Sequence, residues 1–79
     1  MNYERVILNL LNHHSSIRGE YLALRVMEEV NVQKFSNEEF SNALCNLIES
    51  KKVIQLMYTT ENTTKIIYFP GGTTFNIGA

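Results

Sequence analysis

The sequence predicts a single α+β domain in which three helices precede a β-hairpin. Three segments between residues 3 and 49 repeat apolar residues at intervals of three or four, which is typical of amphipathic helices. From residue 53 onward the pattern changes to segments rich in β-branched and aromatic residues, which favour strands. The chain has 79 residues, 44% of them apolar, so it is long enough for one hydrophobic core.

The first helix is predicted to begin at Tyr3 and to end between residues 12 and 14. Asn2 carries a side chain suited to cap its first turn. The apolar positions that share one face of this helix are Tyr3, Val6, Ile7, Leu10 and Leu11. Residues 13–19 (HHSSIRG) then form a connection in which Ile17 is the one apolar residue. We expect Ile17 to lie in a short extended piece and to point into the core.

The second helix is predicted over residues 19–30. Its buried face is expected to carry Leu22, Ala23, Val26, Met27 and Val30. The opposite face carries Tyr21, Leu24, Arg25 and Glu28. Residues 31–35 then connect this helix to the next.

The third helix has the clearest start signal. Ser36 and Glu39 match a capping box, in which the serine oxygen accepts from the Glu39 amide and the glutamate reaches back to the Ser36 amide. Glu38 adds a second carboxylate near the positive end of the helix dipole. The expected buried stripe is Phe40, Ala43, Leu44, Leu47 and Ile48. Lys51 and Lys52 follow the far end, where cations are favoured.

Residues 53–59 and 64–70 are predicted to be the two strands of the hairpin, joined by a turn at residues 60–63. Pro70, Gly71 and Gly72 end the second strand. We therefore assign residues 1–70 to the domain and residues 71–79 to a C-terminal tail. Two alternatives stay open for the tail: a loose segment, or an extra edge strand formed by residues 74–77 (TFNI).

The overall charge limits the functional classes. Seven basic residues oppose eight acidic ones, for a net charge of −1, so any DNA site has to be a local basic patch. The single cysteine excludes a disulfide within the chain, and we interpret Cys45 as a small packing residue at the edge of the buried face. No basic-then-apolar leader opens the sequence, and no apolar run approaches the ~18 residues of a membrane span. We therefore expect a soluble cytoplasmic protein that does not enter a membrane.

The order helix, short extended piece, helix, turn, capped helix and hairpin resembles the winged helix-turn-helix family over residues 3–70. A simple three-helix bundle with a β tail is the structural alternative. The segments that carry the resemblance are IRGEYLA, SNEEFSNALCNLIESKKV and IQLMYTTENTTKIIYF. The resemblance implies that the third helix enters the major groove of DNA and that the hairpin loop, the wing, contacts the DNA backbone or minor groove. The sequence departs from the family at the wing tip, where residues 60–63 contain Glu61 and no basic residue.

The resemblance implies two groups of DNA-binding residues. Arg18, Lys34 and Lys65 occupy places that commonly border phosphates. Ser41, Asn42 and Asn46 of the third helix have side chains that can pair with base edges, adenine in particular. Three cations predict a slope of about −2 to −3 in log K against log salt, which is weak for a monomer and favours a dimer on one site. The alternative is a solvated helix face with lysines that keep the domain soluble.

Five apolar residues are candidates for binding a partner protein or a second copy: Leu8, Tyr21, Leu24, Phe75 and Ile77. Tyr21 and Leu24 project from the second helix, and tyrosine is enriched at protein contacts. Phe75 and Ile77 belong to a tail that can add a strand to a neighbouring sheet or fold back on its own domain. Single exposed apolar residues are nonetheless common on protein surfaces.

The residues needed for catalysis or metal binding are sparse. His13 and His14 are adjacent and therefore lack the i, i+4 spacing of a helical metal site, and a lone cysteine cannot form a zinc-finger set. The sequence has no aspartate and no glycine-rich phosphate loop. We expect no enzymatic activity, no metal, no cofactor and no small-molecule substrate.

Two functions follow as hypotheses. The first is a small stand-alone regulator that binds double-stranded DNA in transcriptional control. The second is a protein-interaction module, an adaptor or inhibitor, that uses the same scaffold without DNA. The first requires folding to gather Arg18, Lys34 and Lys65 into one positive ridge beside residues 41–46, and their separation favours the second.

Overall fold

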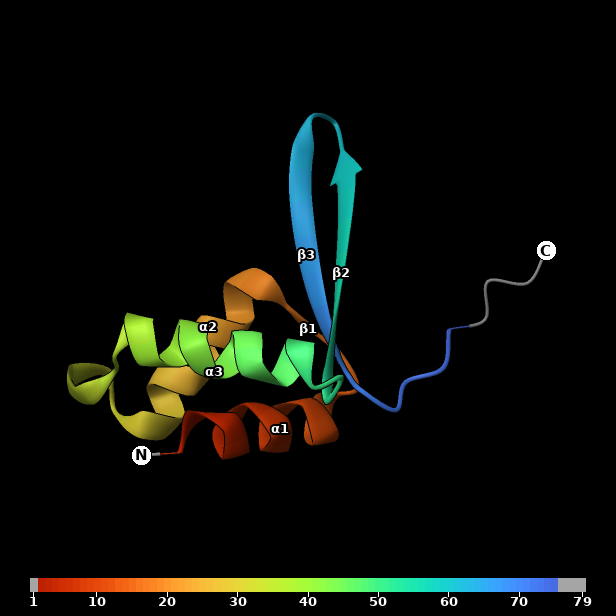
Figure 1. The fold of residues 1–79 in the computed structure, drawn as a ribbon. Coiled ribbons are helices and arrows are strands. Elements are labelled where there is room, and N and C mark those ends of the chain that lie inside the picture. Colours follow the sequence, from red (N-terminus) through yellow and green to blue (C-terminus); the bar gives the residue numbers. More distant parts are fainter. Residues whose placement is uncertain (1, 76–79) are drawn as a thin grey trace.

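The computed structural model describes residues 2–75 and shows three α-helices and a small antiparallel sheet (Figure 1). The element order is the one expected from the sequence. The elements are α1 (Tyr3–His14), β1 (Ile17–Arg18), α2 (Gly19–Val30), the 3-10 helix η1 (Val32–Lys34), α3 (Asn37–Glu49), β2 (Val53–Thr60) and β3 (Thr63–Pro70).

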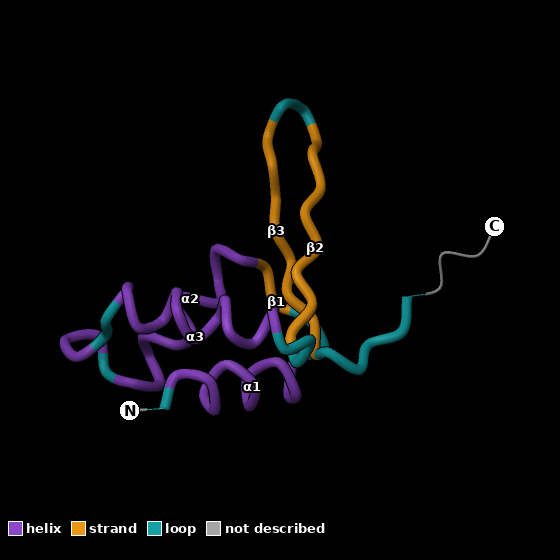
Figure 2. The backbone as a smooth tube through the Cα atoms, viewed as in Figure 1, coloured by secondary structure: helices purple, strands orange, loops and turns teal. Residues whose placement is uncertain are grey.

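The helices lie together and the β2–β3 hairpin projects away from them as an arm, as Figure 2 shows. The strand order of the sheet is β1-β3-β2, and both pairings are antiparallel. β1 contacts only the base of β3, with Ile17 opposite Tyr68 and Arg18 opposite Ile67. The tip of the hairpin is therefore far from the helical layer.

The core contains residues from all three α-helices and from the base of the sheet. Its completely or almost completely buried side chains are Ile7, Leu11, Leu22, Val26, Leu47 and Val53. Ile17 and Tyr68 add the contribution of the paired strands β1 and β3. The inward direction of Ile17 and the predicted helix stripes are confirmed, except that Met27 of α2 is only partly buried and is not among the residues packed against the core.

The turn of the hairpin is shorter than predicted. β2 and β3 each extend one residue further, so the turn consists of Glu61 and Asn62 alone. Both have positive φ angles, of 49° and 67°. Two-residue turns of this kind match the twist of antiparallel strands, which explains why the ladder continues to the pair Thr60 and Thr63.

The start of α3 is capped by two different elements. The Ser36 hydroxyl oxygen accepts from the Glu39 amide at 3.2 Å, as predicted. The reciprocal half of the capping box is wrong, because the Ser36 amide donates to the Tyr3 hydroxyl oxygen at 2.8 Å. The Phe35 ring also packs against both neighbouring rings, with centroid distances of 5.9 Å to Tyr3 and 5.5 Å to Phe40. These contacts fasten the first turn of α1 to the entry of α3.

The far end of α3 and the end of the hairpin meet in one loop. Lys51 has a φ of 64°, and the Lys52 amide donates to the Leu47 carbonyl at 2.9 Å, which ends the helix in a Schellman motif. The Gly71 amide donates to the Lys52 carbonyl at 2.9 Å. The hairpin is thus attached at its base to the end of the helix that precedes it.

Cys45 is exposed, so its interpretation as a packing residue is wrong. The buried stripe of α3 is centred on Ala43, Leu44 and Leu47, and the residue after Leu44 is turned outward by the helix. Leu8 of α1 is half-buried and packs against the edge of the core.

The described part of the tail, residues 71–75, contains no strand. Phe75 packs edge-on against Phe69 of β3, with ring centroids 4.9 Å apart. The predicted edge strand over residues 74–77 ends beyond the described residues, as does Ile77. None of the described helices is long and apolar enough to cross a membrane.

Candidate interaction surfaces

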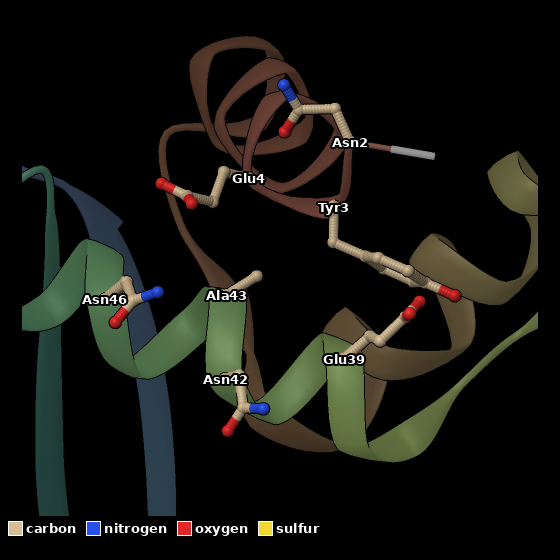
Figure 3. Close-up of a pocket in the computed structure, with 7 residues that line it drawn as sticks. All are labelled: Asn2, Tyr3, Glu4, Glu39, Asn42, Ala43 and Asn46. Carbon is tan, nitrogen blue, oxygen red and sulfur yellow. The ribbon is translucent and has the colours of Figure 1, made fainter.

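The predicted base-reading residues Asn42 and Asn46 line a groove between α1 and α3 (Figure 3). Two carboxylates line the same groove, Glu4 from α1 and Glu39 from α3, and no basic side chain of the described residues does. A phosphate brought to this groove would meet like charges and be repelled. Ser41 is also exposed on α3 but is not among the groove residues.

The three predicted phosphate-contacting cations do not form one ridge. Arg18 and Lys65 line a common pocket beside the start of α2, together with Glu20. Lys34 lies in η1, at the end of the helical layer away from the hairpin (Figure 1). Within the described part of the chain, the pocket with the two cations and the groove with the asparagines share no lining residue. Arg18 and Lys65 therefore lie together, whereas Asn42 and Asn46 line a different groove.

A second pocket lies on the other side of Arg18, between α2 and the base of the sheet. Its lining residues are His14, Ser16, Ile17, Arg18, Tyr21, Arg25 and Ile67. No acidic side chain of the described residues lines it. We call the exposed part of this region, Arg18, Tyr21, Leu24 and Arg25, the Arg18–Tyr21 surface.

Local geometry explains why these side chains gather. Ile17 pairs with Tyr68 and points into the core, so the next residue, Arg18, points to the opposite face of the sheet. Tyr21 and Arg25 are four residues apart on α2 and therefore lie on the same helix face. Leu24 adjoins Tyr21 on that face, and the two side chains are 52% and 51% exposed.

The outer face of the hairpin is a second apolar region. Adjacent cross-strand pairs on this face are Ile54 with Phe69, Leu56 with Ile67 and Tyr58 with Lys65. Leu56 is 43% exposed and the others, Lys65 apart, are half-buried. Because Ile67 also lines the pocket next to Arg18, this face continues into the Arg18–Tyr21 surface.

Sequence reasoning placed Tyr21 and Leu24 correctly on an exposed face but did not select Arg25 or the residues Leu56 and Ile67 of the outer hairpin face. Arg25 had a usable signal, its i, i+4 spacing from Tyr21. Leu56 and Ile67 share a strand face that alternation alone can identify, but only the packing shows that the helices leave this face uncovered. Of the candidate partner-binding residues, Phe75 is 39% exposed and covers Phe69 rather than extending the sheet.

One ionisable side chain in the sheet, Tyr68, has a raised pKa. Burial raises the pKa of the Tyr68 hydroxyl above its usual value of 10.0, and the neighbouring Cys45 raises that pKa further. The hydroxyl therefore stays protonated well beyond neutral pH. No group of three metal-ligating side chains is present among residues 2–75.

Comparison with protein-family models, curated proteins and solved structures finds no match to this chain.

Proposed function

We propose that this chain is a small winged-helix module that binds a partner protein through the Arg18–Tyr21 surface. The observation that carries the proposal is the exposure of Tyr21 and Leu24 between two arginines, beside a pocket that no acidic side chain of residues 2–75 lines. Tyrosine and arginine are among the residues most enriched at the energetic centres of protein interfaces. The element order and the projecting hairpin are compatible with a winged-helix scaffold.

The chemistry of the surface defines the partner. Tyr21 and Leu24 offer rigid apolar area that an aromatic or aliphatic side chain can cover. Arg18 and Arg25 present planar guanidinium groups that bind carboxylates with two parallel hydrogen bonds. The proposed ligand is therefore a peptide segment with an apolar side chain close to an aspartate or glutamate.

Selection from a random peptide library tests this proposal. Wild-type protein should enrich peptides that combine an acidic with an aromatic or aliphatic residue. Tyr21→Ser should weaken the selected peptides by about tenfold or more, because truncation of a central contact costs at least about 1.4 kcal/mol. Val32→Ser is the matched control, since Val32 is 65% exposed but lies in η1.

The proposal fails if no sequence class is enriched. It also fails if Val32→Ser and Tyr21→Ser weaken binding equally, because the apolar contact would then not be specific to this surface. NMR shift changes on peptide addition should concentrate at Arg18, Tyr21 and Arg25.

Double-stranded DNA is the second candidate ligand, favoured by one observation. Arg18 and Lys65 line the same pocket beside the start of α2 and the hairpin, where a winged helix contacts the DNA backbone. Two cations predict a slope of about −2 in log K against log salt. Fluorescence anisotropy with duplex DNA at low salt measures this directly, with Lys34→Gln expected to bind like wild type and Arg18→Gln more weakly. No binding at low salt removes this candidate.

A further inference from the structure

β2 is an edge strand with an unusual composition. In the sheet order β1-β3-β2 it pairs with β3 on one side, and no other strand of the described residues pairs with it. Its eight residues, VIQLMYTT, contain no charged residue and no proline. Natural proteins usually protect a long edge strand with charges, proline, a bulge or a covering element, because its free backbone groups template further pairing. The sequence of β2 supplies neither a charge nor a proline.

The ladder shows which backbone groups of β2 are free. A two-residue turn closes on Thr60 and Thr63, and antiparallel pairs alternate between hydrogen-bonded and non-hydrogen-bonded. The residues whose amide and carbonyl groups point away from β3 are then Val53, Gln55, Met57 and Thr59. No turn, loop or cap hydrogen bond of the described backbone reaches residues 53–60. The backbone groups along this edge are therefore free to pair with another extended strand.

We infer that two copies of this chain pair through their β2 edges, in antiparallel orientation around a two-fold axis at Leu56. This register pairs Gln55 with Met57 of the second copy, so residues with outward backbone groups face each other. Ile54 then lies opposite Tyr58 of the second copy, a β-branched and aromatic pair of the kind that stabilises sheets. The result is one continuous six-stranded sheet.

A second copy fits this edge better than a charged partner. β2 has no charged side chain, so two copies meet without like-charge repulsion along the strand. Ile54 and Tyr58 lie on either side of Leu56, which is at the axis. The apolar side chains of each copy therefore cover those of the other. Leu56, which is 43% exposed in the single chain, becomes the central contact.

The dimer leaves the Arg18–Tyr21 surface free, because β1 and β2 are the two opposite edges of the sheet. The inference therefore does not depend on the proposed function. If both hold, each dimer presents two peptide-binding surfaces.

Sedimentation equilibrium over a range of protein concentrations tests the pairing. Wild type should show a monomer–dimer equilibrium, and Leu56→Lys should raise the dimer dissociation constant by about tenfold or more, since it places like charges opposite each other. Leu24→Lys is the matched control, the same substitution at a similarly exposed leucine on α2, and should leave the dimer unchanged. A wild-type chain that stays monomeric at every concentration overturns the inference.

Disulfide trapping tests the register. In a Cys45→Ser background, Leu56→Cys should form a covalent dimer on oxidation, because a non-hydrogen-bonded pair brings two Cβ atoms within disulfide reach. Gln55→Cys in the same background should not, because Gln55 faces Met57 of the second copy. Cross-linking through Gln55→Cys in place of Leu56→Cys overturns the register.

Discussion

The packed end of the molecule and the projecting arm contain similar apolar residue types, but these side chains are buried in the packed end and exposed in the arm. Val53, at the base of β2, is 1% exposed, whereas Leu56 on the same strand is 43% exposed and Met57 is 58% exposed. The difference comes from position relative to the helices (Figure 1). Val53 lies on the strand face that packs against the core, whereas Leu56 lies on the opposite face and Met57 lies further toward the tip of the hairpin. Apolar side chains in the arm therefore add little to the stability of a single chain and remain available for contacts with other molecules.

The largest expected effect tests that comparison directly. Leu22→Ala should lower the free energy of unfolding by about 2–5 kcal/mol, because Leu22 is fully buried and the cavity cannot close. Leu56→Ala, the same substitution in the arm, should cost less than about 1 kcal/mol at high dilution. Urea unfolding followed by circular dichroism measures both values. Equal losses would show that the arm contributes to stability as the core does.

The next effect lies at the junction of the two regions. A Cβ atom on Gly71 would collide with the Lys51 carbonyl oxygen and lie 2.9 Å from the Lys52 Cα, whereas a Cβ on Gly72 meets nothing within 4 Å. Gly71→Ala should therefore destabilise the chain by about 1–3 kcal/mol through backbone displacement. Gly72→Ala is the control and should lie within about 0.5 kcal/mol of wild type. A harmless Gly71→Ala would mean that the base of the hairpin is loosely attached.

A smaller effect is expected from one hydroxyl at the opposite end of the helical layer. Tyr3→Phe removes the acceptor of the Ser36 amide and should cost about 1–2 kcal/mol, the usual penalty for an unsatisfied, partly buried donor. Tyr21→Phe removes the same group from an exposed ring and should be neutral. Thermal unfolding of the two variants side by side separates a capping role for the hydroxyl from a general effect of tyrosine.

The smallest effect depends on pH. The pKa of Tyr68 is raised in the folded chain, so the unfolded chain ionises first, near pH 10.0. The stabilisation is complete below that pH and is lost as the pH rises through the higher pKa of the folded state. Tyr68→Phe should consequently lose less stability than wild type between neutral pH and the alkaline range. Identical alkaline losses for both proteins would remove Tyr68 as the titrating group.

The sequence alone determined most of the secondary structure. The limits of α2, the Asn2 cap and the buried stripes of all three α-helices follow from periodicity and capping preferences. Even the pairing of β2 with β3 follows from the predicted strand limits, although the predicted turn, residues 60–63, is longer than the observed turn of Glu61 and Asn62. The helix features depend on residues within a few positions of one another, and the hairpin joins two segments that are adjacent in sequence, so local propensity and short-range patterns are sufficient.

The functional surfaces were decided by the tertiary structure. The Ser36 amide is bound by Tyr3, 33 residues away, and not by its local partner Glu39. Packing of α1 against α3 adds the Glu4 carboxylate to the groove of Asn42 and Asn46, and η1 carries Lys34 to the end of the helical layer away from the hairpin. The direction in which helices cross and the face of the sheet that they cover depend on contacts between distant residues. Periodicity identifies an exposed face but does not show which other exposed faces will lie next to it.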